Sequence, residues 1–110
     1  MTMADMPAAA FIRATLAMRR TDAGGRRRPI ASGYRCDCRL ESLVDEYTGA
    51  AVYLERATSL GPGEIGLIRL FPAFPHKWQD ISPGSVVDLC EGPRVIGVAT
   101  VVEVASTDER

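Results

Sequence analysis

The sequence predicts an all-β protein, a six-stranded antiparallel closed β-barrel. Short runs of β-branched, aliphatic and aromatic residues alternate with clusters of Gly, Pro and Asp, at the spacing typical of sandwiches and barrels. No segment shows the period of an amphipathic helix. Closing the sheet would also remove the exposed edges that favour aggregation. A chain of 110 residues has the size of one domain with one core.

The first predicted strand spans residues 11–18 and ends at a Gly-rich turn over residues 22–25. The second spans residues 34–40, where apolar and charged side chains alternate. Because strand side chains point to opposite faces in turn, the charged set should face solvent. The inward set is Tyr34, Cys36, Cys38 and Leu40, and the outward set is Arg35, Asp37 and Arg39.

The remaining four strands are predicted over residues 50–55, 65–71, 86–90 and 95–104. In the last strand, simple alternation places Ile96, Val98, Val102 and Val104 on one face. Gly97 and Ala99 on the other face leave room for close packing or for a partner. The predicted barrel therefore covers residues 10–104, between a flexible N-terminal arm of residues 1–9 and a polar tail of residues 105–110.

The composition narrows the class of protein. Hydrophobic residues make up 46% and charged residues 25% of the chain, as in soluble globular proteins. Its apolar runs are far shorter than the ~20 residues of a membrane-spanning helix. Residues 1–10 lack the basic start of a secretory signal. We expect a cytoplasmic protein that does not associate with membranes.

We expect no metal, no cofactor and no catalysis. Cys36, Cys38 and Cys90 form no Cys-x-x-Cys pattern, so they should be reduced, packed thiols. Residues 61–66 match Gly-x-Gly-x-x-Gly but precede a strand pattern, and no Gly-x-x-x-x-Gly-Lys-Ser/Thr sequence occurs, so the chain alone should not bind GTP. No nucleophile or acidic partner accompanies His76 at a suggestive spacing.

Charge is unevenly distributed along the chain. Residues 1–39 carry eight arginines and three acidic residues, whereas residues 40–110 carry five basic and eleven acidic residues. This asymmetry favours either an anionic partner at one end of the molecule or mutual neutralisation of the two halves in the fold. The run Arg26-Arg27-Arg28, with Arg35 and Arg39, either forms a phosphate-binding patch or is a solvated set paired with Asp22, Asp37 or Glu41.

Two motifs lie near the ends of the predicted barrel. Residues 24–35 read Gly-Gly-Arg-Arg-Arg-Pro-Ile-Ala-Ser-Gly-Tyr-Arg, and residues 91–97 fit Glu-Gly-x-Arg-x-x-Gly. Thr-Gly, Pro-Gly and Phe-Pro steps at residues 48, 62 and 71 lie between them. In this order the motifs resemble the C-terminal (third) barrel domain of translation elongation factor Tu, here standing alone. The resemblance implies a six-stranded barrel that contacts the T arm of aminoacyl-tRNA and is touched by the nucleotide-exchange factor.

The resemblance also implies roles for single residues. By this resemblance, Arg26 stands where the family has a tRNA-contacting arginine. Thr48 and Glu91 stand at family positions that contact the T stem of the tRNA, and Gly92 lies beside Glu91. Asp37 departs from the family, which has an RNA-binding glutamine there, and a carboxylate repels phosphate. We expect the tRNA- or partner-binding surface to comprise Arg26, Arg28, Arg35, Thr48, Glu91, Gly92 and Trp78.

The segment over residues 73–83 is longer than in the family and holds the only His, Lys and Trp of the chain. Trp78 either stacks on a base or anchors a protein partner, or it folds back as a lid on the barrel. The function expected is a non-catalytic binding module for a translation component, either a tRNA arm or a protein. The alternative is a self-associating structural or regulatory barrel, most simply a homodimer, with no RNA binding.

Overall fold

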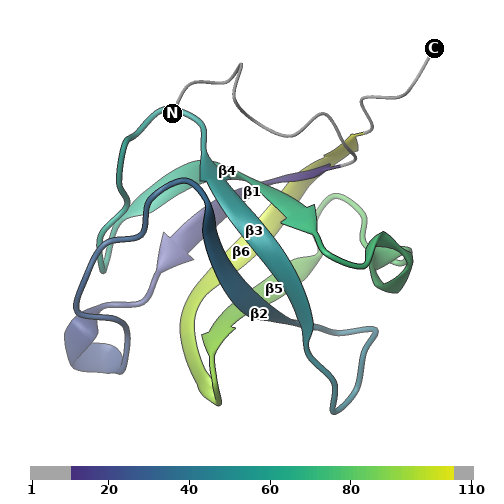
Figure 1. The fold of residues 1–110 in the computed structure, drawn as a ribbon, viewed down its shortest axis with the longest axis horizontal. Helices are drawn as coiled ribbons and strands as arrows, with labels where there is room; N and C mark the ends of the chain where they lie inside the picture. Colours follow the sequence, from purple (N-terminus) through teal and green to yellow (C-terminus); the bar gives the residue numbers. More distant parts are fainter. Residues whose placement is uncertain (1–10, 106–110) are drawn as a thin grey trace.

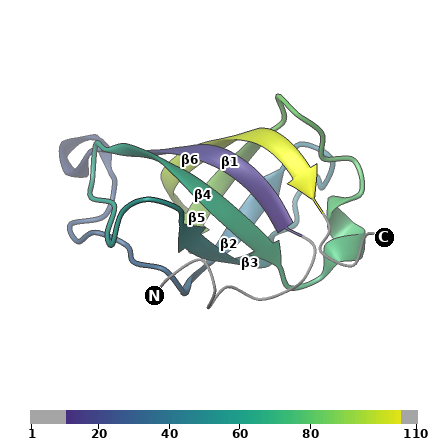
Figure 2. The ribbon, with the colours of Figure 1, turned by 90° about the horizontal axis from the view of Figure 1, so that it is seen from above.

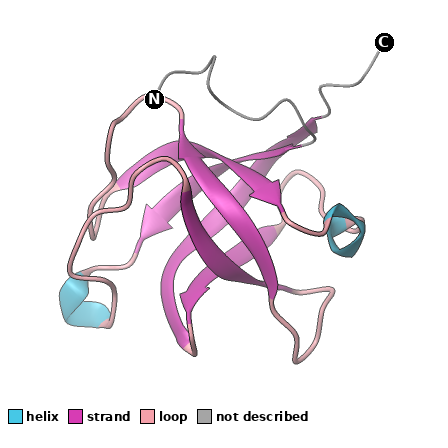
Figure 3. Ribbon diagram, viewed as in Figure 1, coloured by secondary structure: helices cyan, strands magenta, loops and turns pink. Residues whose placement is uncertain are grey.

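Residues 11–105 form a closed six-stranded barrel in a computed structural model that describes this part of the chain (Figure 1). The predicted fold class is confirmed. Two short 3-10 turns are the only helical elements of the described residues (Figure 3), and no helix there is long and apolar enough to span a membrane. The elements are β1 (Phe11–Met18), η2 (Thr21–Ala23), β2 (Tyr34–Leu40), β3 (Thr48–Leu54), β4 (Ile65–Pro72), η3 (Pro75–Trp78), β5 (Val86–Glu91) and β6 (Arg94–Ala105).

The ends of the chain differ slightly from the expected boundaries. Ala105, assigned to the polar tail, is the last residue of β6. The expected arm of residues 1–9 and the rest of the expected tail lie outside the described residues.

All six strand pairs are antiparallel, in the order β1-β4-β3-β2-β5-β6, and β6 pairs back onto β1. Phe11 at the start of β1 lies opposite Ala105 at the end of β6. Figure 2 shows β1 lying between β6 and β4. The first strand therefore joins the last strand, and this pairing closes the sheet.

Inward side chains of the strands fill the barrel interior, and in β2 they come from every second position, as predicted. One end is closed by a bridge in which Ile30 and Leu60 exchange two backbone hydrogen bonds of 2.9 Å. The opposite end is covered by Trp78 from η3, whose side chain belongs to the core. The largest fully buried side chains are Leu16, Ile30, Ile68, Leu70, Leu89, Ile96, Val52, Val87, Cys38 and Cys90.

The expected faces of β6 are wrong over residues 97–102. Ile96, Ala99 and Val101 are buried, whereas Val102 and Val104 are 46% and 53% exposed. The register of β6 shifts against β5 between Leu89 and Cys90, and it shifts against β1 at the Arg13–Ala14 step. Each β-bulge adds one residue to β6 and so reverses the alternation of faces, which simple period-two reasoning misses.

The three cysteines are free, as expected. The Cys36 and Cys38 sulfur atoms lie 3.9 Å apart inside the barrel. The contact with Cys36 and burial together raise the pKa of the Cys38 thiol, and burial raises that of Cys90. Because thiolates are the reactive form, Cys38 and Cys90 are packing residues at neutral pH.

Candidate nucleic-acid interface

Four arginines gather at the barrel end opposite Trp78. This end is built from the loop between η2 and β2 and from the turn between β5 and β6. An open hollow of about 320 Å³ lies between the two segments. It is lined by Arg26, Arg27, Arg28 and Arg94, with Glu91 as the one acidic residue.

Gly25 allows the arginine loop to pass close to the backbone of Arg19 and Arg20, directly after β1. Its amide donates a 2.9 Å hydrogen bond to the Arg20 carbonyl. A β-carbon at position 25 would lie 2.2 Å from the Arg19 carbonyl oxygen, closer than any side chain permits. The Thr21 hydroxyl then donates to the Arg26 carbonyl at 2.6 Å. These contacts fix the backbone position from which Arg26 extends.

Arg26 is held by a three-residue network. Its guanidinium forms a salt bridge with Glu91, and the Tyr34 hydroxyl donates to the same carboxylate. The guanidinium also lies over the Tyr34 ring at 4.9 Å, and its Nε donates to the Arg28 carbonyl at 3.0 Å. The Arg26 side chain is only 19% exposed. Arg26 is thus oriented before any ligand arrives.

This network fixes the charges of its members at neutral pH. Burial alone would raise the pKa of Glu91, but hydrogen bonds from Tyr34 and Arg26 outweigh burial and lower it. Burial and the neighbouring carboxylate raise the pKa of Tyr34. Tyr34 therefore stays a neutral donor, and Glu91 stays an anion that cancels about one of the four positive charges.

The β5–β6 turn brings Arg94 to the hollow. Glu91 and Arg94 pair across two turn residues, so Gly92 occupies the first central position. Gly92 has φ +60°, as a type II′ hairpin turn requires at this position. Arg94 then lies 3.5 Å from the Glu91 carboxylate and donates to the Gly25 carbonyl at 3.4 Å. Gly92 thus makes the turn possible, and the side chains of Glu91 and Arg94 on either side of the turn line the arginine hollow.

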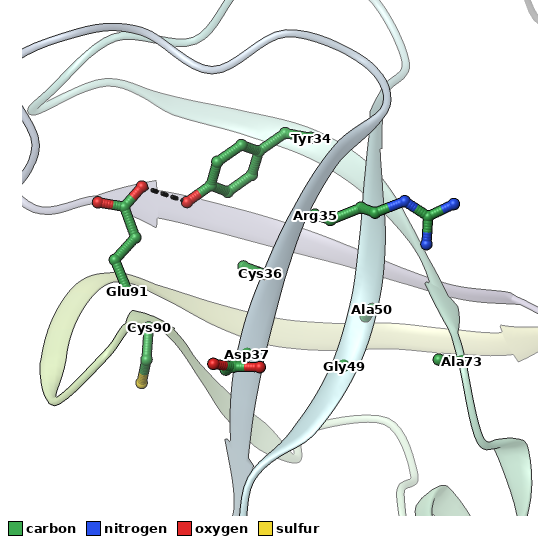
Figure 4. A pocket seen from close by; sticks show the side chains of 9 residues that line it. All are labelled: Tyr34, Arg35, Cys36, Asp37, Gly49, Ala50, Ala73, Cys90 and Glu91. Carbon is green, nitrogen blue, oxygen red and sulfur yellow. Dashed lines mark hydrogen bonds between the residues drawn. The ribbon is translucent and has the colours of Figure 1, made fainter.

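A second hollow, of about 380 Å³, begins at Glu91 and follows β2 toward the start of β3. Figure 4 shows the Tyr34–Glu91 hydrogen bond at one side of this hollow and Arg35 extending away from Glu91. Asp37 lies opposite Cys90 in the strand register. The exposed Asp37 carboxylate therefore lines the part of this hollow that is farther from the arginines. Its negative charge disfavours binding of phosphate there.

The predicted site residues fall into three groups. Arg26, Arg28, Glu91 and Gly92 meet at the arginine end, and Arg35 is exposed on β2 but points elsewhere. Thr48 and Trp78 are buried, at 4% and 5% exposure, so neither side chain is on the accessible surface. Of the two roles considered for Trp78, the lid is the one found.

Sequence reasoning missed Tyr34 and Arg94 as members of this cluster. The position of Arg94 could have been predicted from the sequence. Glu-Gly-Pro-Arg is typical of a two-residue hairpin turn, which places the side chains of Glu91 and Arg94 next to each other. Tyr34 had no such signal, since its partner Glu91 lies 57 residues away in the chain.

The arrangement suits binding of an anion. Guanidinium groups donate paired hydrogen bonds to phosphate, and here three arginines surround one that is already oriented. Over residues 11–105, no group of three or more His, Cys, Asp or Glu side chains is placed to hold a metal ion. The sequence matches no protein-family model and no curated protein.

Proposed function

We propose that the protein is a non-catalytic binding module of the translation apparatus, related to the C-terminal domain of elongation factor Tu. Its arginine end, formed by Arg26, Arg27, Arg28 and Arg94, contacts the phosphate backbone of a tRNA arm. The observation that carries this proposal is the clustering of these four side chains around one hollow. A protein that normally engages the factor is the other candidate for this surface.

Physical chemistry favours phosphate at this end. No salt bridge involves Arg27 or Arg28 among the described residues, so both are available to a ligand. Arg26 is restrained by Glu91 and Tyr34 and loses little freedom on binding. Backbone phosphates are recognised by such clusters without base contacts, so the affinity should depend strongly on salt.

Substituting Arg28 should reduce the salt dependence of tRNA binding. We expect the wild-type protein to bind aminoacyl-tRNA at physiological salt, with a linear fall of log K against log salt concentration. Arg28→Gln should flatten that slope by about 0.7 to 0.9, the value of one phosphate contact, and Arg27→Gln with Arg28→Gln by about twice as much. Titrations by mobility shift at several salt concentrations, with aminoacylated and deacylated tRNA, measure both quantities.

Arg39→Gln is the matched control for charge. It also removes one arginine, but on β2, where Arg39 pairs with Asp88 and does not line the arginine hollow. Its slope should equal that of the wild type. Equal slopes for the Arg28 and Arg39 variants, or no binding by the wild type at physiological salt, would contradict the proposal.

Self-association is a second candidate, supported by exposed apolar side chains elsewhere on the barrel. Phe74, Val102 and Val104 are 55%, 46% and 53% exposed. A second copy packed on these side chains would remove them from water. In this case sedimentation velocity should show a dimer whose fraction rises with protein concentration and is insensitive to Arg28→Gln. A single monomeric species at high concentration would exclude this function.

A further inference from the structure

A third hollow lies at the barrel end away from the arginine cluster. It has a volume of about 360 Å³ and sits between the β2–β3 loop and the first residues of β5. Strand β2 connects the two regions, from Tyr34 beside Glu91 to Leu40 at this hollow. We call this feature the loop hollow. None of its lining residues lines the arginine hollow.

The loop hollow has two exposed aliphatic side chains among its lining residues. Val44 is 81% exposed and Val86 is 39% exposed. Leu40 and Leu43 lie beneath them and are packed into or against the core. An aliphatic side chain as exposed as Val44 gains by contact with an apolar partner.

The loop is held in shape without a ligand. The Leu43 amide donates to the Leu40 carbonyl at 3.1 Å. Glu46 forms a salt bridge with Lys77 of η3, which ties the far side of the loop to the barrel lid. Asp45 takes φ +60° in between, a conformation that Asp and Asn tolerate better than most residues. A surface fixed in this way pays less entropy on binding.

The rim of the loop hollow is acidic. Asp88 is neutralised by Arg39 at 2.7 Å. Glu41 and Asp45 are exposed and form no salt bridge with any described residue. Two uncompensated carboxylates beside an apolar floor repel nucleic acid and attract basic groups. The complementary surface is aliphatic and flanked by positive charge.

We propose that the loop hollow docks a basic, aliphatic segment of a protein partner. One or two Leu- or Ile-like side chains contact Leu43, Val44 and Val86, while flanking Lys or Arg side chains pair with Glu41 and Asp45. The volume is at the small end of the range for binding clefts, so a short segment fills it. This site is independent of tRNA binding. If both proposals hold, the barrel joins an RNA at one end to a protein at the other.

The test uses a fluorescent ten-residue peptide made of alternating lysine and leucine pairs, followed by fluorescence anisotropy against the full chain. We expect saturable binding by the wild type and none to a version with serine for leucine. Val44→Ser should weaken binding about tenfold. Glu41→Gln with Asp45→Asn should weaken it about fivefold and reduce its salt dependence, and asparagine suits the positive φ at position 45.

Val104→Ser is the matched control, because Val104 is also more than half exposed but does not line the loop hollow. Its affinity for the peptide should equal that of the wild type, as should that of Arg28→Gln. Two results would overturn the proposal: no saturable binding by the wild type, or equal losses for the two valine variants. Loss of tRNA binding in Arg28→Gln with peptide binding intact would separate the two sites.

Discussion

Trp78→Ala should lower the free energy of unfolding by about 3 to 5 kcal/mol, the range for truncating a large buried aromatic residue. Trp78 is 5% exposed and belongs to the core at the barrel end that η3 covers. Removing the indole exposes apolar core side chains at this end of the barrel, because none of the six strands covers them there. Urea denaturation followed by far-UV circular dichroism measures the change without relying on the tryptophan as a probe.

Trp78→Phe separates the bulk of the ring from its polar group. The indole Nε1 is buried and has no hydrogen-bond partner among the described residues. Replacing it therefore breaks no hydrogen bond and removes an unpaired donor. The phenylalanine variant removes only part of the buried ring, so it should lose clearly less than the alanine variant, below about 3 kcal/mol. Similar losses for the two variants would show that filling the barrel end is not the role of this residue.

Glu55→Gln should lower the free energy of unfolding by about 2 kcal/mol at pH 7, within the range for hydrogen bonds to a charged group, because Arg13 and Arg69 stay partly exposed to solvent. The Glu55 side chain is 7% exposed and accepts two hydrogen bonds from Arg13, at 2.8 and 2.9 Å. It accepts a third from Arg69 at 3.2 Å. Arg13 and Arg69 are direct neighbours across β1 and β4, so losing the carboxylate leaves two like charges opposed.

The effect should depend on pH in a defined direction. Burial would raise the pKa of Glu55, but the two arginines outweigh burial and lower it below the usual value. A lowered pKa in the folded state means that the stabilisation is complete above the unfolded pKa, about 4.3 for glutamate. It is lost as the pH falls through the folded value. The difference between wild type and Glu55→Gln should therefore be constant near neutrality and shrink in acid.

Glu103→Gln is the control for this prediction. Glu103 also pairs with Arg13, but it is 51% exposed and the contact is 3.5 Å long. An exposed pair of this kind contributes between zero and about 1 kcal/mol. Equal losses for the Glu55 and Glu103 variants would mean that burial of the triad does not determine its contribution. A gap between the two variants that is unchanged in acid would contradict the pKa argument.

Local sequence patterns predicted the strands well because each strand carries its own signal. Residues 11–18 and 34–40 were predicted to the residue, and the alternating faces of β2 were correct. The predicted start of β3 was two residues late, because its pairing partner in β2 extends it to Thr48. The two bulges of β6 were not predictable, since they depend on the register of neighbouring strands.

The arginine end was only partly predictable for the same reason. The charge of the run at residues 26–28 is visible in the sequence, and so is the glycine that precedes it. Arg26 is restrained by contacts between residues that are far apart in the sequence. Glu91 is 65 positions from Arg26 and 57 from Tyr34, so no local pattern predicts these contacts. Thr48 was predicted wrongly in the other direction. The family resemblance implied a surface position, but the side chain is buried in this structure.

The pairing of β1 with β6 also determines when this protein can fold. Phe11 meets Ala105 across the closing seam, so the pairing of β1 with β6 waits for the last strand to be synthesised, although β1 can pair with β4 before that. Until then β1 and β5 each present an unpaired edge. Contacts this distant in sequence make folding slow compared with helical domains of similar size. During synthesis on the ribosome the nascent barrel remains open, and exposed to aggregation, until β6 leaves the exit tunnel.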